Sequence, residues 1–125
     1  MRTRSRSVRT EFNGVEFLSM LEAEWALRWA TLGVAYRYEA VRIKTETQAY
    51  TPDFILPKYR AFIEIKPNEP TDDEFLRSAL GCDVLGGWIF VVTGRPCLHT
   101  IYAPRMVSGK WVYGITESRH LPFPV

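Results

Sequence analysis

The sequence predicts a single α/β domain in which helices flank a mixed central β-sheet. Its 125 residues, 46% of them hydrophobic, suffice for one core and leave little room for a second domain. Two stretches carry helix-start and helix-stop signals, and others carry the alternation or the apolar runs typical of strands. Because one predicted helix lies between two predicted strands, a right-handed crossover should make those two strands parallel.

The first helix is expected to begin near residue 17 or 19 and to end at Leu32. Ser19 and Glu22 have the spacing of a capping box, in which side chains of the first turn satisfy free backbone N–H groups. Gly33 follows as a natural stop, because glycine adopts the left-handed conformation that ends many helices. The apolar residues that should form a broad buried face are Leu18, Leu21, Trp25, Leu27, Trp29 and Leu32.

Three strands are expected to follow, over residues 35–44, 50–56 and 60–66. The first shows an imperfect alternation, and a polar stretch then turns the chain into the second. The short segment Pro57-Lys58-Tyr59 leads into the third strand. Such short connections favour antiparallel neighbours, so these strands should form a meander.

A second helix is expected from Thr71, which opens a T-x-x-E capping box, to about Val84. The apolar run over residues 88–93 has the character of a buried strand that lies parallel to the third strand. Residues 99–103 and 110–115 should form a C-terminal hairpin. The predicted order is therefore helix, three strands, helix, strand and terminal hairpin.

The distribution of charge suggests a flexible basic arm over residues 1–11, in front of a domain that spans residues 12–125. Four basic residues precede the first acidic residue, Glu11, namely Arg2, Arg4, Arg6 and Arg9. Subtracting these four from the 16 basic residues leaves 12, against 14 acidic residues. A basic arm of this kind contacts phosphates or serves as a solubilising tail, and the sequence leaves both readings open.

The composition argues against several classes of protein. Cys82 and Cys97 are the only cysteines and form no C-x-x-C pair, so a reducing cytoplasmic compartment is expected rather than a disulfide scaffold. His99 and His120 are the only histidines, and no ladder of ligands at zinc-binding spacing accompanies them. No apolar run approaches the ~20 residues that span a bilayer, so neither a membrane partner nor a secretory signal is expected.

The most informative stretch holds three charged residues among apolar ones. Side chains alternate along a strand, so Glu64 and Lys66 should share one face of the third strand. Charged groups on a covered face are costly unless they are paired or bind something. Asp53 comes from the preceding strand, and a hairpin of this length can place it beside Glu64. The ordinary alternatives are a solvated strand edge for Glu-x-Lys and a turn for Pro-Asp.

The chemistry of these side chains points to a metal site. Two neighbouring carboxylates repel each other unless a cation lies between them. Mg²⁺ prefers oxygen ligands and keeps several waters, so Asp53 and Glu64 are a suitable pair of ligands. An ion held there would polarise a phosphodiester and lower the pKa of a bound water. Lys66 would orient or help to deprotonate that water, or stabilise charge on the phosphate.

These residues resemble the motif of the PD-(D/E)xK nuclease superfamily. The matching residues are Pro52-Asp53 and then Glu64-Ile65-Lys66. The resemblance implies a restriction-endonuclease-like α-β-β-β-α-β core with a mixed central sheet flanked by helices, here followed by a C-terminal hairpin. It also implies that Asp53 and Glu64 bind Mg²⁺ or Mn²⁺ and that Lys66 assists the attack of water. The same element order follows independently from the periodicity.

A further resemblance lies upstream of this motif. Residues 12–14 and 17–26 look like the first helix of small phage and bacterial members similar to transposon-end endonucleases, which carry a glutamate facing the metal. By position, the resemblance makes Glu22 that residue and a third metal ligand. Two alternatives stay open: Glu22 only closes the capping box, or Glu24 takes its place. Residues two apart point about 200° apart on a helix, so a structure distinguishes them.

We therefore predict a metal-dependent DNA endonuclease in the cytoplasm of a bacterial or phage-infected cell. The resemblance covers roughly residues 12–94 and leaves the terminal hairpin unexplained. Lys58 and Arg60 join the basic arm as candidates for sequence-independent contact with the DNA backbone. A homodimer, or a larger phage or mobile-element assembly, would be compatible with this activity.

Two rival functions fit the same residues. One is a catalytically inactive nucleic-acid-binding or assembly subunit with the same fold. The other is a structural protein of a phage or mobile element that uses the acidic pocket for stability. If the site is functional, neutralising Asp53 should not unfold the domain, because clustered carboxylates repel each other.

Overall fold

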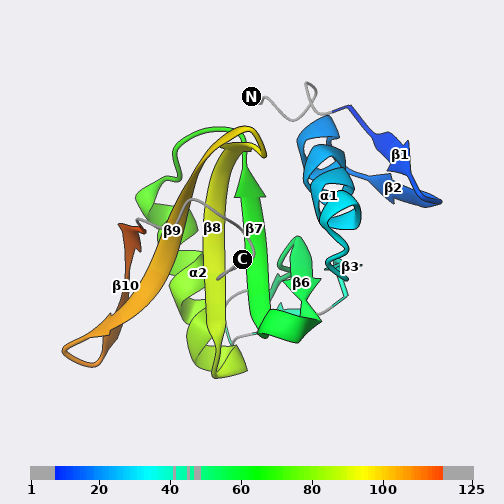
Figure 1. The fold of residues 1–125 in the computed structure, drawn as a ribbon. Helices are drawn as coiled ribbons and strands as arrows, with labels where there is room; N and C mark the ends of the chain where they lie inside the picture. The colour runs from blue at the N-terminus through cyan, green and yellow to red at the C-terminus, as the bar shows by residue number, and fades with distance from the viewer. Residues whose placement is uncertain (1–7, 41, 45, 47–48, 117–125) are drawn as a thin grey trace.

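The computed structural model describes residues 8–116, except residues 41, 45 and 47–48. It contains two α-helices and a six-stranded sheet, with small hairpins beside them (Figure 1). In chain order the elements are β1 (Thr10–Phe12), β2 (Val15–Phe17), α1 (Met20–Leu32), β3 (Arg37–Tyr38), β4 (Ile43–Lys44), β5 (Ala49–Tyr50), β6 (Phe54–Leu56), the 3₁₀ turn η2 (Pro57–Tyr59), β7 (Ala61–Lys66), α2 (Asp72–Leu85), β8 (Trp88–Arg95), β9 (Leu98–Val107) and β10 (Lys110–Ile115).

The main sheet is mixed, as the sequence predicts. Its strand order is β10-β9-β8-β7-β6-β3. β7 and β8, joined by α2, pair in parallel, and every other neighbouring pair in this sheet is antiparallel. The expected C-terminal hairpin is present as β9 and β10, and β9 also pairs with β8, so the hairpin extends the sheet.

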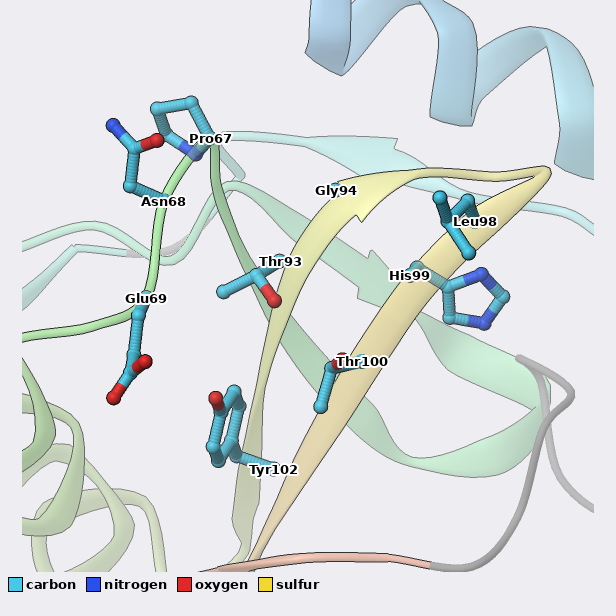
Figure 2. A pocket seen from close by; sticks show the side chains of 9 residues that line it. All are labelled: Pro67, Asn68, Glu69, Thr93, Gly94, Leu98, His99, Thr100 and Tyr102. Atoms are coloured by element: carbon cyan, nitrogen blue, oxygen red, sulfur yellow. The ribbon is translucent and has the colours of Figure 1, made fainter.

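An open hollow lies where the parallel strands end (Figure 2). After β7, residues 67–69 turn away from the sheet before α2 begins, which leaves a space of about 390 Å³ between this loop and strands β8 and β9. The hollow is lined by Pro67, Asn68, Glu69, Thr93, Gly94, Leu98, His99, Thr100 and Tyr102. The carboxyl ends of parallel strands are where ligands of α/β sheets commonly bind.

The expected strand over residues 35–44 does not form as one strand. β3 covers only Arg37–Tyr38 and is followed by Glu39, whose positive φ of 49° takes the chain out of the sheet. β4 then pairs with β5 in a separate two-stranded sheet. The expected strand over residues 50–56 is interrupted as well, because Pro52 has no N–H with which to continue a ladder. The meander β3-β6-β7 is therefore real but contains an inserted hairpin.

The predicted boundary between the arm and the domain, after residue 11, lies too far along the chain. Thr10 and Glu11 already belong to β1, which pairs with β2 across an Asn13-Gly14 turn with positive φ at both residues. Arg9 lies 3.6 Å from the carboxylate of Glu16, so this arginine is tied to the hairpin. Arg2, Arg4 and Arg6 lie outside the described residues.

The predicted start and end of the first helix and the predicted start of the second are confirmed. The Ser19 hydroxyl accepts a hydrogen bond from the backbone N–H of Glu22, and Gly33 ends α1 in the left-handed conformation. Thr71 and Glu74 form a complete capping box at the start of α2. Within the described part of the chain, neither helix is long and apolar enough to cross a bilayer.

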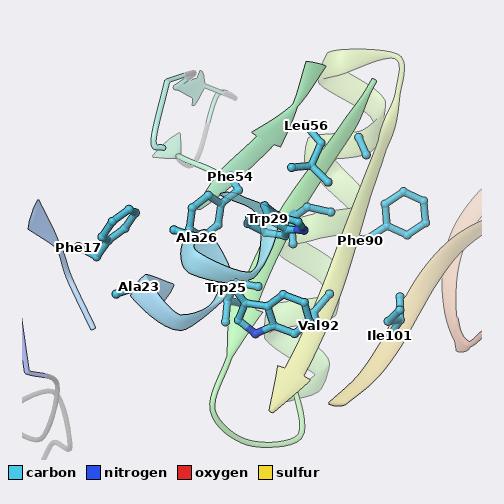
Figure 3. Packing of buried hydrophobic residues seen from close by; sticks show 13 residues of the cluster. Phe17, Ala23, Trp25, Ala26, Trp29, Phe54, Leu56, Phe90, Val92 and Ile101 are labelled. Carbon is cyan, nitrogen blue, oxygen red and sulfur yellow. The ribbon is translucent and has the colours of Figure 1, made fainter. Parts of the chain in front are cut away.

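Two cores of unequal size lie on the two faces of the sheet. The larger core packs α1 against the sheet (Figure 3), with Trp25 and Trp29 almost completely buried over Ile63. The smaller core, under α2, is centred on Cys82 and Ile89. Its partly buried neighbours are Tyr50, Phe62, Leu85 and Trp111. The α1 face is therefore apolar, whereas the α2 face includes polar groups.

Candidate active site

Strand β7 presents Glu64 and Lys66 on the face of the sheet that α2 covers. The Lys66 ammonium lies 3.3 Å from Oε2 of Glu64 and 3.1 Å from Oε2 of Glu74 in the first turn of α2. Glu64 is only 7% exposed. The predicted Glu-x-Lys pair is thus a buried, paired group, and the alternative of a solvated strand edge is wrong.

Asp53 lies at the point where β6 and β7 separate. The last paired residues are Phe54 and Ile63, and beyond them the side chain of Asp53 takes the place of a strand partner. Its Oδ2 accepts a hydrogen bond of 2.8 Å from the backbone N–H of Ile65. The backbone N–H of Asp53 also lies close enough to the Glu64 carboxylate to lower the pKa of that glutamate. The bond to Ile65 ties the aspartate to the strand that carries the glutamate.

Glu22 reaches the same region from α1. Its Oε1 accepts a hydrogen bond of 2.5 Å from the hydroxyl of Tyr38, which itself accepts one from the backbone N–H of Leu18. The side chain is 8% exposed. The Glu22 side chain is therefore bound to Tyr38, and its backbone N–H is the group that takes part in the cap with Ser19. The alternative that Glu22 only closes a capping box is wrong.

Glu24 points elsewhere. Its Oε1 accepts a hydrogen bond of 2.8 Å from the guanidinium of Arg95, whose side chain is 68% exposed. This is a surface ion pair, of the kind that contributes little to stability. Glu24 is therefore not the substitute for Glu22, and the helical register expected from the resemblance is the one observed.

The acidic groups influence one another electrostatically. Burial raises the pKa of Asp53 well above its usual range, and the charges of Glu64 and Glu22 raise it further. Burial also raises the pKa of Glu22. It raises the pKa of Glu64 despite the opposing effect of Lys66. All three carboxylates therefore hold their protons more tightly than they would in water.

Lys66 is held in its charged form. Burial alone would lower the pKa of its ammonium, but the carboxylates of Glu64, Glu74 and Asp53 outweigh burial and raise it. The same ammonium also lowers the pKa of Glu74. The Lys66 ammonium is thus shared between Glu64 of the acidic site and Glu74 of α2. Around Asp53 there are therefore more buried carboxylates than cations to pair with them.

This excess fits a hard divalent cation. Carboxylate oxygens are the ligands that Mg²⁺ and Mn²⁺ prefer, and a cation between Asp53 and Glu64 would relieve their repulsion. Among the residues that the structure describes, however, no three His, Cys, Asp or Glu side chains are gathered closely enough to form a metal cluster. An ion would therefore bind mainly to Asp53 and Glu64 and keep several waters, with Glu22 further out.

Lys58 and Arg60 lie away from this site. Both precede β7, whereas Lys66 ends it, so Arg60 and Lys66 are about 20 Å apart at the 3.3 Å rise per residue of a strand. Arg60 ends the η2 turn, and the ammonium of Lys58 lies over the ring of Tyr59. Both residues are exposed, and their contact with the DNA backbone, at a distance from the catalytic groups, stays a prediction.

Three residues of the site were missed by the sequence argument. Tyr38 and Tyr50 donate hydrogen bonds to Glu22 and Glu64, and Glu74 pairs with Lys66. Glu74 was noted only as part of a capping box, a role it also fills. Nothing local to either tyrosine indicates its partner, because each bond joins residues at least 14 positions apart.

The fold and the site define a mixed α/β domain with a buried acidic group and a lysine at the carboxyl end of a central strand. No protein-family model, curated protein or solved structure matches this chain. The geometry of the site itself is therefore the basis for assigning a function.

Proposed function

We propose that this chain is a metal-dependent DNA endonuclease of the PD-(D/E)xK type with a restriction-endonuclease-like core. One observation carries the proposal: where β6 and β7 separate, Asp53 is bound to the backbone of β7 at the residue after Glu64, with the ammonium of Lys66 3.3 Å from Glu64. The order of the core elements, α1, β3, β6, β7, α2 and β8, supports it.

Asp53 and Glu64 would hold Mg²⁺ or Mn²⁺, and Glu22 would complete the acidic site. When bound, such an ion supplies a Lewis acid that polarises the phosphodiester and lowers the pKa of a water. The raised pKa values of the three carboxylates support this assignment, because burial disfavours their charged forms and, at Asp53 and Glu22, neighbouring carboxylates add to this effect. A bound cation would favour the charged forms of these groups.

Lys66 would act as a cation rather than as a base. Its pKa is raised by the surrounding carboxylates, so the ammonium keeps its proton at neutral pH. A protonated lysine donates hydrogen bonds, which orient the attacking water and offset negative charge that develops on the phosphate. Of the roles that the sequence left open for Lys66, proton abstraction is the one that this environment opposes.

The hollow beside the site gives a substrate room to approach. Lys66 and Thr93 are partners across the β7–β8 pair, and Thr93 lines the hollow, so Lys66 neighbours a lining residue. Among the described residues that line the hollow there is no lysine or arginine. Affinity for the DNA backbone would therefore come from Lys66 and from exposed cations outside the hollow, which include the predicted basic arm.

Digestion of plasmid and branched DNA with Mg²⁺ or Mn²⁺ tests this proposal. Lys66→Ala should lower the cleavage rate by about 10²–10⁴-fold, the range expected for a group that stabilises the transition state. Lys58→Ala is the matched control, because it removes a lysine at the other end of β7. Its kcat should equal that of the wild type, and loss of a contact with the DNA backbone there would raise only the KM.

Two results would contradict the assignment. Cleavage that survives both Lys66→Ala and Asp53→Ala would place the catalytic groups elsewhere. Salt-sensitive DNA binding without cleavage of any substrate would favour the inactive binding or assembly subunit. A homodimer and a larger assembly stay predictions, which the size of the protein in solution would test.

A further inference from the structure

The small hairpin inserted between β3 and β6 reaches the acidic site. It consists of β4 and β5, pairs with no strand of the main sheet, and lies against α2. Its last residue, Tyr50, donates a hydrogen bond of 3.0 Å from its hydroxyl to Oε1 of Glu64. The insertion thus adds a contact to a glutamate that the strands of the core alone would not supply.

Tyr50 is itself held from two directions. Its ring packs against the small core around Cys82 and Ile89. Its hydroxyl lies close to the side chain of Ser78 on α2, which is 2% exposed. The ring is therefore held by buried neighbours, and the hydroxyl is directed at Glu64.

Tyr113 of β10 borders the same small core from the terminal hairpin. Its hydroxyl donates a bond of 2.6 Å to the backbone carbonyl of Ile89 and lies 3.5 Å from Sγ of Cys82. Ser78 lies close enough to the hydroxyls of Tyr50 and Tyr113 to influence the pKa of both. The hydroxyl of Tyr50 therefore lies among polar side chains that α2 and the terminal hairpin contribute.

The two oxygens of Glu64 have different partners. Oε1 accepts from Tyr50, and Oε2 faces the ammonium of Lys66. The terminal torsion of a glutamate has a broad energy profile, so neither partner alone fixes the plane of the carboxylate. With both partners present, rotation of the carboxylate breaks at least one of the two contacts.

We infer that Tyr50 is a positioning residue. It orients the Glu64 carboxylate toward the divalent metal ion that Glu64 and Asp53 would bind together. The inference rests on the proposed function and deepens it, because it assigns a role to a hairpin outside the strands of the core. Groups that hydrogen-bond to a metal ligand orient it, and their loss commonly lowers metal affinity or activity by 10–100-fold. Tyr50 touches neither the substrate nor the reacting atoms in this role.

Tyr50→Phe tests the inference, since it keeps the ring in the core and removes only the hydroxyl. We expect the affinity for Mn²⁺, measured by calorimetry without DNA, to fall at least about tenfold. The kcat for DNA cleavage at a fixed Mn²⁺ concentration should fall, while the KM for DNA stays close to the wild-type value. The Tm without metal should fall by no more than about 5–8 °C, as the loss of one buried hydrogen bond implies. Ser78→Ala should have a smaller effect in the same direction, because Tyr50 stays in place.

Tyr59→Phe is the matched control and should behave as the wild type, because Tyr59 lies in the η2 turn at the far end of β7. Wild-type Mn²⁺ affinity in Tyr50→Phe would overturn the inference and leave the proposed function intact. A fall in affinity together with a large fall in Tm would also overturn it, since Tyr50 would then be architectural. A wild-type protein that neither binds Mn²⁺ nor cleaves DNA would overturn both proposals.

Discussion

The two faces of β7 differ in chemistry although their residues alternate along one strand. Toward α1, Ile63 and Ile65 are buried in an apolar core beneath Trp25 and Trp29. Toward α2, the same strand carries Glu64 and Lys66 together with Phe62. Both faces are covered by a helix. The contrast therefore lies in the chemistry of the side chains on each face and not in their exposure to solvent.

The α1 face of β7 mainly stabilises the fold, whereas the α2 face carries the charged groups of the candidate site. The α1 face removes large apolar side chains from water, which is the main favourable contribution to folding. The α2 face buries charge, which is unfavourable unless every group has a partner. The hydrogen bond from Tyr50, the bond that Asp53 accepts from Ile65 and the ion pairs of Lys66 supply those partners. The apolar face offsets the cost of keeping a charged site in the same sheet.

The largest effect is expected on the apolar face. Trp29→Ala should lower the free energy of unfolding by about 3–5 kcal/mol, because it leaves a cavity in the larger core. Trp88→Ala, at a tryptophan that is 56% exposed, should cost no more than about 1 kcal/mol. Urea unfolding of both variants measures the contrast. Equal losses would show that α1 does not supply the main core.

An intermediate effect on the free energy of unfolding is expected at Asp53. Whether the protein becomes less or more stable depends on the residue that replaces the aspartate. Asp53→Ala leaves the buried N–H of Ile65 without an acceptor, at a cost of about 1–3 kcal/mol. Asp53→Asn keeps an oxygen for that bond and removes the charge that Glu22 and Glu64 oppose. Without metal at neutral pH, we expect Asp53→Asn to be at least as stable as the wild type. An asparagine variant less stable than the alanine variant would contradict this.

The same comparison has a defined dependence on pH. The pKa of Asp53 is raised in the folded protein, so the folded state binds more protons than the unfolded state above the ordinary value of 3.8. Its contribution to stability is present below that pH and is lost as the pH rises through the raised pKa. The stability of Asp53→Asn relative to wild type should therefore increase from about pH 4 upward, and added Mn²⁺ should reduce the difference.

The smallest effect is expected at Glu24, which shares α1 with Glu22. Glu24→Gln loses only an exposed ion pair with Arg95 and should change the free energy of unfolding by less than about 0.5 kcal/mol. Its rate of DNA cleavage should equal that of the wild type, whereas Glu22→Gln should slow cleavage. If Glu24→Gln instead abolished cleavage, the assignment of the helix residue would be wrong.

The elements that the sequence predicts well are those defined by short-range interactions. Ser19 and Thr71 cap helices through bonds to residues three positions away, and Gly33 and Gly86 end those helices through their own backbone conformation. The Asn13-Gly14 turn is equally local. Its two residues with positive φ form the turn of the β1–β2 hairpin, whereas the charge distribution alone suggests an arm up to residue 11.

The strands between the helices were predicted less well. Periodicity indicated a strand over residues 35–44, but the left-handed Glu39 and the inserted hairpin depend on contacts with Asp53 and α2, far along the chain. Local alternation does not report such contacts, because a strand forms only where a partner strand accepts its hydrogen bonds. The broken strands proved to carry Tyr38 and Tyr50, which hold two of the predicted acidic residues.

By itself, the sequence determined which residues have the chemistry for the site and that Glu64 and Lys66 share a face, since alternation along a strand is a property of the backbone. The tertiary structure alone decided that Asp53 replaces a strand partner at the separation of β6 and β7, that Lys66 is shared with Glu74, and that Tyr50 binds Glu64. These contacts join distant segments, so their geometry depends on how the helices and the sheet pack together.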